Sequence, residues 1–148
     1  MPEWQPTSLS RVLDYERPDR YIVTDTDYVE NGTPVLTANK GFILGYTDKK
    51  EGIFEDIPVI IFDDFTTDKK FVDFPFKVKS SAIKILKNRR NDQLKLVYEL
   101  MNGLRFDPTQ HKRYYISEYQ HLSIPLPDHS EQQKIADCLG SLDDRIAA

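Results

Sequence analysis

The most apolar stretch of the chain spans residues 58–62 and consists of a proline followed by branched and aromatic side chains. A continuous run of this length is typical of a β-strand that is buried on both faces. Two other short runs with strand-like composition, at residues 34–37 and 41–46, follow the Asn31-Gly32 pair, which is a strong turn signal. We therefore predict two short strands after a turn, and then a buried central strand at residues 58–62.

Beyond residue 71 the apolar positions alternate with polar ones. Period-two spacing predicts a half-buried strand whose inner face carries Phe74, Phe76 and Val78. The same spacing places Lys77 and Lys79 together on the outer, solvated face. A further strand is predicted at residues 83–85, after a pair of serines.

Helical spacing occurs at two places. Apolar side chains recur at helical intervals over residues 92–103, which predicts a helix that begins at the Asn91-Asp92 pair and stops near Gly103. A second helix, predicted over residues 129–148 with Ser130 as its cap, carries an apolar seam with the a/d spacing of a coiled coil. The seam residues are Ile135, Leu139, Leu142 and Ile146. A polar loop at residues 105–115 and a proline-interrupted extended run at 122–127 lie between the two helices.

These elements predict an α+β fold. We expect residues 1–128 to form a mixed, mostly antiparallel β globular domain with a few short helices, followed by a C-terminal helix that bears the seam. A length of 148 residues allows one domain with a short appendage. We interpret residues 129–148 as the start of a connector helix, because about two heptads are too few for an independently stable coiled coil.

The charges of the chain are unevenly distributed along the sequence. The formal net charge is −4, but residues 69–95 carry 9 basic and 2 acidic side chains. By contrast, residues 1–68 carry 6 basic and 14 acidic side chains, and residues 96–148 carry 5 and 8. On the polar face of a sheet the middle segment would form a basic patch, and such a patch binds phosphates regardless of DNA sequence. The charge pattern therefore favours a one-sided contact with DNA.

Two kinds of side chain are candidates for that contact. Lysines of the basic segment are suited to phosphates, and we select Lys69, Lys70, Lys77 and Lys79. Polar side chains on two predicted loops are suited to base edges, namely Asn39, Lys40, Gln110, His111, Lys112 and Arg113. Tyr114 is suited either to an apolar contact with a thymine methyl or to packing beneath the loop. We interpret Lys84, Lys87 and Lys95 as solvated surface, and Tyr115 as core.

The remaining chemistry points to no catalytic residue, metal site or cofactor. Asp63-Asp64 and Asp68 resemble the acidic residues that hold a metal in nucleases, but acidic pairs after strands are common turn formers. The three histidines, at residues 111, 121 and 129, share no helical face and are expected at the surface. We expect the single cysteine, Cys138, to be a small buried thiol beside the seam. The lone cysteine and the lack of an apolar leader or membrane segment favour the cytoplasm.

Two parts of the sequence resemble a known family. The segment IPLPDHSEQQKIADCLGSLDDRI at residues 124–146 combines a proline-bounded strand, the Glu131-Gln132 pair and the seam, in that order. This combination resembles the junction between domain and helix in specificity subunits of type I restriction-modification systems. The block from Pro34 to Leu86 also resembles one class of target-recognition domain in those subunits.

The resemblance implies a non-catalytic DNA reader that needs no cofactor of its own. Its domain would contact one half of a bipartite target in double-stranded DNA, and its helix would bridge to a second recognition domain or to a second copy of the chain. The helix would also dock DNA adenine methyltransferase subunits, which bring S-adenosylmethionine, and an endonuclease subunit that translocates DNA joins such complexes. Family members usually have two recognition domains, so the chain corresponds to a half-subunit or a fragment.

Two other functions stay open on the residues alone. A protein-interaction adaptor would recruit a partner helix through the seam and leave its basic face solvated. A metal-dependent nuclease would use the acidic residues around Asp64. Charge reversal at Lys77 and Lys79 separates a DNA reader from an adaptor, and Asp64→Ala tests for a nuclease.

Overall fold

A four-stranded antiparallel sheet forms the centre of the computed structural model, which describes residues 4–147 and the side chains of the last helix as far as Cys138. Its strands, in spatial order, are β2 (Leu13–Glu16), β8 (Ile83–Asn88), β5 (Val59–Asp63) and β6 (Lys69–Val72). Every residue of β5 is buried, which confirms the predicted central strand. The run is continuously apolar because each face of the sheet covers a separate core, with Ile60 and Phe62 in one and Val59 and Ile61 in the other.

The first core lies between this sheet and a layer of helices and short strands. That layer contains α1 (Leu9–Val12), α2 (Leu94–Asn102) and the two-stranded antiparallel sheet of β1 (Gln5–Ser8) and β9 (Ser123–Leu126). Tyr115 and Tyr119 fill the same core, and Tyr119 opens the short 3-10 helix η2 (Tyr119–His121). The aromatic core role predicted for Tyr115 is therefore confirmed.

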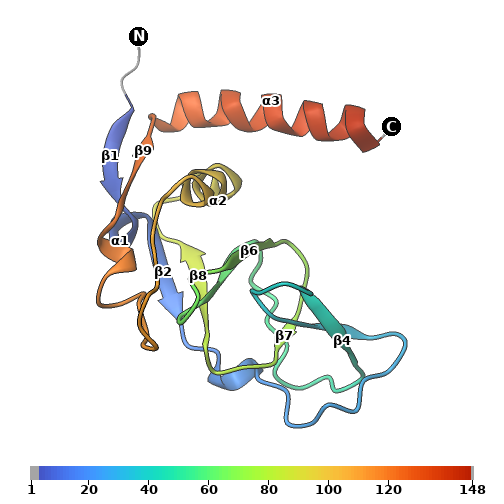
Figure 1. Ribbon diagram of the computed structural model, residues 1–148. Coiled ribbons are helices and arrows are strands. Elements are labelled where there is room, and N and C mark those ends of the chain that lie inside the picture. Colours follow the sequence, from blue (N-terminus) through green and yellow to red (C-terminus); the bar gives the residue numbers. More distant parts are fainter. Residues whose placement is uncertain (1–3, 148) are drawn as a thin grey trace.

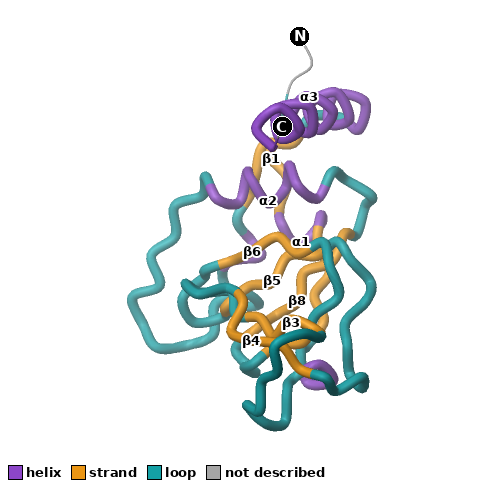
Figure 2. Tube along the Cα trace, turned by 90° about the vertical axis from the view of Figure 1, so that its right-hand side faces the viewer, coloured by secondary structure: helices purple, strands orange, loops and turns teal. Residues whose placement is uncertain are grey.

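The second core lies under a three-stranded sheet. Its strand order is β4 (Ile43–Thr47), β3 (Thr33–Leu36), β7 (Lys77–Val78), with β3 and β4 antiparallel and β3 and β7 parallel. A second 3-10 helix, η1 (Asp19–Tyr21), connects β2 to this half of the molecule. Figure 1 shows α2 on one side of β8 and the strands β4 and β7 on the other, and Figure 2 shows the same layers from a perpendicular direction.

The last helix, α3 (His129–Ala147), follows β9 directly and crosses the top of the domain beside α2 (Figure 1). Asp128 caps it, because its Oδ1 accepts a hydrogen bond of 2.9 Å from the backbone N–H of Glu131, so the predicted cap at Ser130 is wrong. Ile135 packs against the first core. The other predicted seam side chains, those of Leu139, Leu142 and Ile146, lie outside the described residues.

The α+β fold class is confirmed, whereas several local predictions are wrong. The segment from Phe71 to Val78 is divided between β6 and β7, which belong to different sheets, and does not form one half-buried strand. Cys138 is exposed and not buried, because it lies beyond Ile135, the residue through which α3 packs against the first core. None of the described helices is long and apolar enough to cross a lipid bilayer.

Candidate nucleic-acid interface

The basic segment at residues 69–95 does not form the continuous patch that its sequence predicts. Five of its cations form ion pairs with acidic side chains, most of which come from the segments around it. The pairs are Lys84–Asp64, Lys87–Glu16, Arg89–Asp14, Arg90–Asp92 and Lys95–Glu99. Folding therefore neutralises much of a charge that is concentrated only along the sequence.

Lys77 is the clearest departure from the predicted solvated face. Its residue is only 6% exposed, and its ammonium donates a hydrogen bond to the backbone carbonyl of Glu51. The antiparallel bridge between Phe54 and Phe76 brings the chain around Glu51 beside β7, where it covers this side chain. Lys84 is also buried, at 8% exposure, so its interpretation as solvated surface is wrong.

The two lysines of β6 are half-buried. Burial lowers the pKa of Lys69, an effect that the neighbouring charge of Asp68 only partly offsets. The Lys69 ammonium donates to the carbonyl of Thr67 at 3.2 Å and lies 5.7 Å from the ring centre of Tyr119. Lys69 is thus oriented toward the core side of the sheet, and Lys70 lies beside it on the edge strand.

The turn at residues 63–68 joins the loops that carry the other candidates. Asp63 shapes this turn, because its Oδ1 accepts hydrogen bonds from the backbone N–H groups of Phe65 at 2.8 Å and Thr66 at 2.9 Å. The amide nitrogen of Asn39 donates to Thr66 Oγ1 at 2.9 Å and to Asp68 Oδ2 at 2.8 Å. Both amide hydrogens of Asn39 are therefore engaged, and the side chain fixes its loop to the turn.

The polar loop at residues 105–113 contacts the same turn from another direction. The Phe65 ring stacks on His111, with 5.1 Å between ring centres and an interplanar angle of 17°. The guanidinium of Arg113 lies 5.0 Å from the Phe65 ring centre and donates to the carbonyl of Ser81 at 3.3 Å. Loops that are far apart in sequence are therefore adjacent around Phe65.

We use the name loop surface for six exposed polar side chains on or beside these loops: Lys40, Lys79, Gln110, His111, Lys112 and Arg113. Lys79 belongs to it because its backbone N–H donates to the carbonyl of Leu36 at 3.2 Å, directly before the Asn39 loop. Lys112 forms an ion pair of 2.8 Å with Glu118, which raises the pKa of its ammonium above the ordinary value. The loop surface thus combines cations with amide and imidazole groups.

Tyr114 lies beneath the loop surface. It is 3% exposed, and its hydroxyl both donates to the carbonyl of Gln110 and accepts from the N–H of Gln110, at 2.7 Å in each case. The second of its two predicted roles, packing under the loop, is the one that this geometry provides. Tyr114 therefore shapes the loop and presents no ring to a ligand.

The acidic residues that suggested a nuclease have structural partners. Asp64 is 1% exposed, pairs with Lys84 at 2.9 Å and accepts from the backbone N–H groups of Tyr114 and Tyr115 at 3.2 and 2.8 Å. Asp63 shapes the turn, and Asp68 accepts from Asn39. Within the described part of the chain, no three His, Cys, Asp or Glu side chains are grouped as metal ligands.

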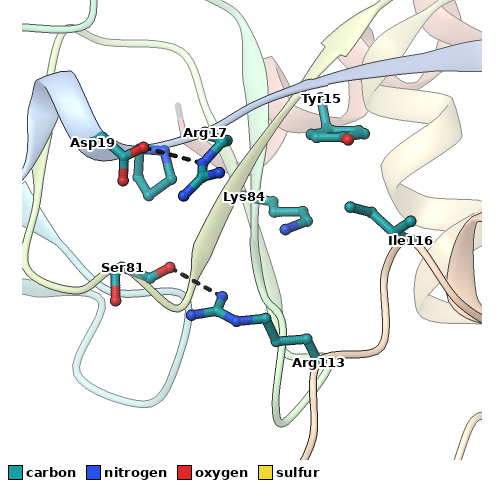
Figure 3. A pocket seen from close by; sticks show the side chains of 8 residues that line it. Tyr15, Arg17, Asp19, Ser81, Lys84, Arg113 and Ile116 are labelled. Atoms are coloured by element: carbon teal, nitrogen blue, oxygen red, sulfur yellow. Dashed lines mark hydrogen bonds and ion pairs between the residues drawn. The ribbon is translucent and has the colours of Figure 1, made fainter.

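A pocket next to the loop surface contains residues that sequence reasoning did not select. It has a volume of about 270 Å³ and is lined by Tyr15, Arg17, Pro18, Asp19, Ser81, Lys84, Arg113 and Ile116 (Figure 3). Arg17 lies in the acidic N-terminal segment, so the charge distribution along the sequence could not reveal it. Phe65, the ring on which the loops meet, was also missed, because a lone aromatic in a turn carries no signal.

The chain matches one protein family and is similar to a specificity subunit of known type. Residues 1–148 match the family described as Type I restriction modification DNA specificity domain. The chain is similar to the Type I restriction enzyme EcoR124I/EcoR124II specificity subunit of Escherichia coli, with 46% identity over 139 residues. That similarity covers 89% of this chain and 34% of the relative, so the chain spans about a third of the relative's length.

Solved structures share the fold. The HsdS subunit from Thermoanaerobacter tengcongensis superposes with a TM-score of 0.58 and 19% identity, over 99% of this chain and 39% of that one. A chain from a structure on complex assembly and conformational transition of the type I R-M system superposes with a TM-score of 0.62 and 17% identity, over 99% and 40%. At these identities the superpositions establish the common fold.

Proposed function

The chain belongs to the family of type I restriction modification DNA specificity domains, and from this premise we propose that it recognises one half of a bipartite target in double-stranded DNA. The observation that carries the proposal is the 46% identity to a specificity subunit, which extends over 89% of this chain. The chain is non-catalytic in this proposal. It directs DNA adenine methyltransferase subunits, which bring S-adenosylmethionine, and an endonuclease subunit that translocates DNA, to the target in the cytoplasm.

The side chains of the loop surface support two kinds of contact with DNA, one with phosphates and one with base edges. Lys40, Lys79 and Lys112 are exposed cations on three different loops, and exposed cations supply affinity for phosphates. Gln110 and His111 are exposed and directly precede Lys112 in the chain, and side chains of these types donate and accept hydrogen bonds at base edges. The loops are held by hydrogen bonds and by the Phe65 stack, which favours a surface organised before DNA arrives.

The position of α3 supports a role in assembly. The helix packs on the domain through Ile135 and continues beyond that contact along the top of the molecule (Figure 1). We propose that its remaining length contacts a second recognition domain, or a second copy of this chain, and the methyltransferase subunits. Residues 1–128 are the recognition domain in this proposal, and residues 129–148 belong to the connector.

Selection from a pool of randomised DNA duplexes tests the proposed function. We expect the full chain to enrich one short motif. The logarithm of its affinity for that motif should fall linearly with the logarithm of the salt concentration. The Gln110→Ala and Lys112→Ala variants should lose enrichment or affinity. Lys134→Ala is the matched control, because Lys134 is exposed on α3, which contributes no residue to the loop surface. Binding without an enriched motif, or equal enrichment by all variants, would contradict the proposal.

A further inference from the structure

The pocket in Figure 3 gathers three cations from three separate parts of the chain. Arg17 follows β2, Lys84 lies on β8, and Arg113 belongs to the polar loop. The Arg17 side chain is 77% exposed at the rim, and the Arg113 side chain is 52% exposed. The Lys84 side chain, by contrast, is 9% exposed and lines the pocket from below the ring of Tyr15. The pocket therefore has a buried cation at its base and two exposed cations at its rim.

The carboxylates nearby do not cancel this charge. Lys84 and Arg113 share one carboxylate oxygen, Asp64 Oδ2, at 2.9 and 3.6 Å. The other oxygen of Asp64 is occupied by the backbone N–H groups of Tyr114 and Tyr115. Arg17 pairs with Asp19 at 3.1 Å, but both side chains are largely exposed, and such surface pairs are weak and exchange readily. An excess of positive charge therefore faces the pocket.

Two exposed apolar side chains, Tyr15 and Ile116, lie beside the cations in the wall of the pocket. Tyr15 is 42% exposed and Ile116 is 49% exposed, so both present apolar surface to a molecule bound in the pocket. A small inorganic anion would neutralise the cations but leave both side chains uncovered. The sugar that adjoins a backbone phosphate, by contrast, offers apolar surface next to the charge and could cover them.

We propose that this pocket holds one phosphate of the DNA backbone, with the adjoining deoxyribose against Tyr15 and Ile116. The inference rests on the proposed function and deepens it, because it names a contact that fixes the position of the DNA on the domain. Arg113 links the two sites, since it lines the pocket and belongs to the loop surface. A phosphate fixed here would set the register in which the loop surface meets the bases.

A scan with neutral methylphosphonates tests the pocket. The duplex selected by the chain is synthesised with one backbone phosphate at a time replaced by a methylphosphonate, and the affinity of the wild-type chain is measured at each position. We expect one position at which the substitution lowers affinity about tenfold, the loss typical of one charge-assisted contact. In the Arg17→Ala variant, unmodified DNA should bind up to about tenfold more weakly. The same methylphosphonate should then lower affinity by a smaller factor than in the wild type, because only Lys84 and Arg113 still face the phosphate.

Two controls separate the contact from general effects. Lys134→Ala should retain the full penalty at that position, and circular dichroism should show that Arg17→Ala remains folded, as its exposure predicts. Inorganic phosphate, added at constant ionic strength, should not compete with DNA. Competition at constant ionic strength would identify a site for free anions and would overturn the assignment to the DNA backbone.

The failure of the pocket is distinguishable from the failure of the proposed function. The wild-type chain can bind its selected motif while each methylphosphonate lowers affinity equally in wild type and Arg17→Ala. In that case the pocket inference is wrong and the proposed function stands. If the wild-type chain selects no DNA at all, the proposed function is wrong and the pocket inference is wrong with it.

Discussion

Gln132 donates a hydrogen bond of 3.0 Å from Nε2 to Oδ1 of Asp92, and both side chains are buried. The same Nε2 donates to the carbonyl of Pro127 at 2.9 Å, and Gln132 Oε1 accepts from the backbone N–H of Gln93 at 2.8 Å. Arg90 completes the arrangement with two hydrogen bonds of 3.1 Å to Asp92. These contacts tie the first turn of α3 to the start of α2, so they orient the connector relative to the domain.

Replacement of Gln132 by leucine should destabilise the protein by about 1–3 kcal/mol, because it leaves the N–H of Gln93 and the carbonyl of Pro127 without this partner and removes one hydrogen bond from Asp92. Urea unfolding followed by circular dichroism measures the change. Lys134→Ala, two residues further along the same helix and exposed, should change the free energy of unfolding by less than about 0.5 kcal/mol. An equal, small effect of both substitutions would show that the buried amide does not hold the helix.

The same cluster predicts an acid sensitivity. Burial raises the pKa of Asp92, but hydrogen bonds from Arg90, Gln132 and His129 and the charge of Arg90 outweigh burial and leave the pKa below its ordinary value of 3.8. A carboxylate whose pKa is lower in the folded state contributes stability that is complete above its unfolded pKa. That contribution is lost as the pH falls below 3.8 through the folded pKa.

Asp92→Asn should therefore lower the free energy of unfolding near neutral pH and also flatten its decline in acid. Urea unfolding at a series of pH values measures both effects. The difference between wild type and variant should shrink as the pH drops below about 4, because the wild-type carboxylate then becomes neutral as well. A difference that stays constant down to the acid transition would contradict the assigned ionised state of Asp92.

The buried pair of Lys84 and Asp64 should contribute more to stability than the half-buried pair of Lys87 and Glu16. Lys84→Met leaves the buried Asp64 with only the more distant, exposed Arg113 as a cation and should cost about 3 kcal/mol in stability. Lys87→Met removes a half-buried partner of Glu16 and should cost at most about 1 kcal/mol. Thermal or urea unfolding of the two variants provides the comparison, and a smaller loss for Lys84→Met than for Lys87→Met would refute it.

Charge reversal should have different effects at Lys77, which lies on β7, and at Lys79, which follows it, although the sequence pattern predicted the same solvated face for both. Lys79→Glu should leave the fold intact, weaken DNA binding to all sequences and reduce the slope of log affinity against log salt by about one. Lys77→Glu should instead lower the free energy of unfolding by about 3 kcal/mol, because it puts a carboxylate against the carbonyl of Glu51. A larger loss of stability in Lys79→Glu than in Lys77→Glu would conflict with the observed burial of Lys77.

Hydrophobic periodicity predicted the parts of the fold that depend on local pattern. The central strand, the helix at Leu94–Asn102 and the last extended run were all recognisable, because burial on one or both faces leaves a regular spacing. The strands β1 and β2 were not recognised as strands. Each is short, and β1 exists through pairing with β9, a partner more than a hundred residues away that no local pattern reports.

The sequence predicted which loop of the candidate site is exposed, but it did not predict which of the cations are neutralised by ion pairs. The polar character of residues 105–115 indicated an exposed loop, and most of its polar side chains are exposed. The clustering of lysines in sequence was misleading, because strand pairing brings Glu16 to Lys87 and Asp64 to Lys84 across long separations. Arg17 and Ile116 reach the pocket through the same long-range packing, so neither residue could be selected beforehand.

The most direct test of the central claim is to sequence the methylated adenines in the genome of a host that expresses this chain together with its methyltransferase subunits. We predict one bipartite methylated motif that disappears when the chain is deleted. Replacement of the loops at residues 37–42 and 105–113 should change one half of the motif and leave the other half unchanged. Methylation of the same motif in the absence of the chain would contradict the account.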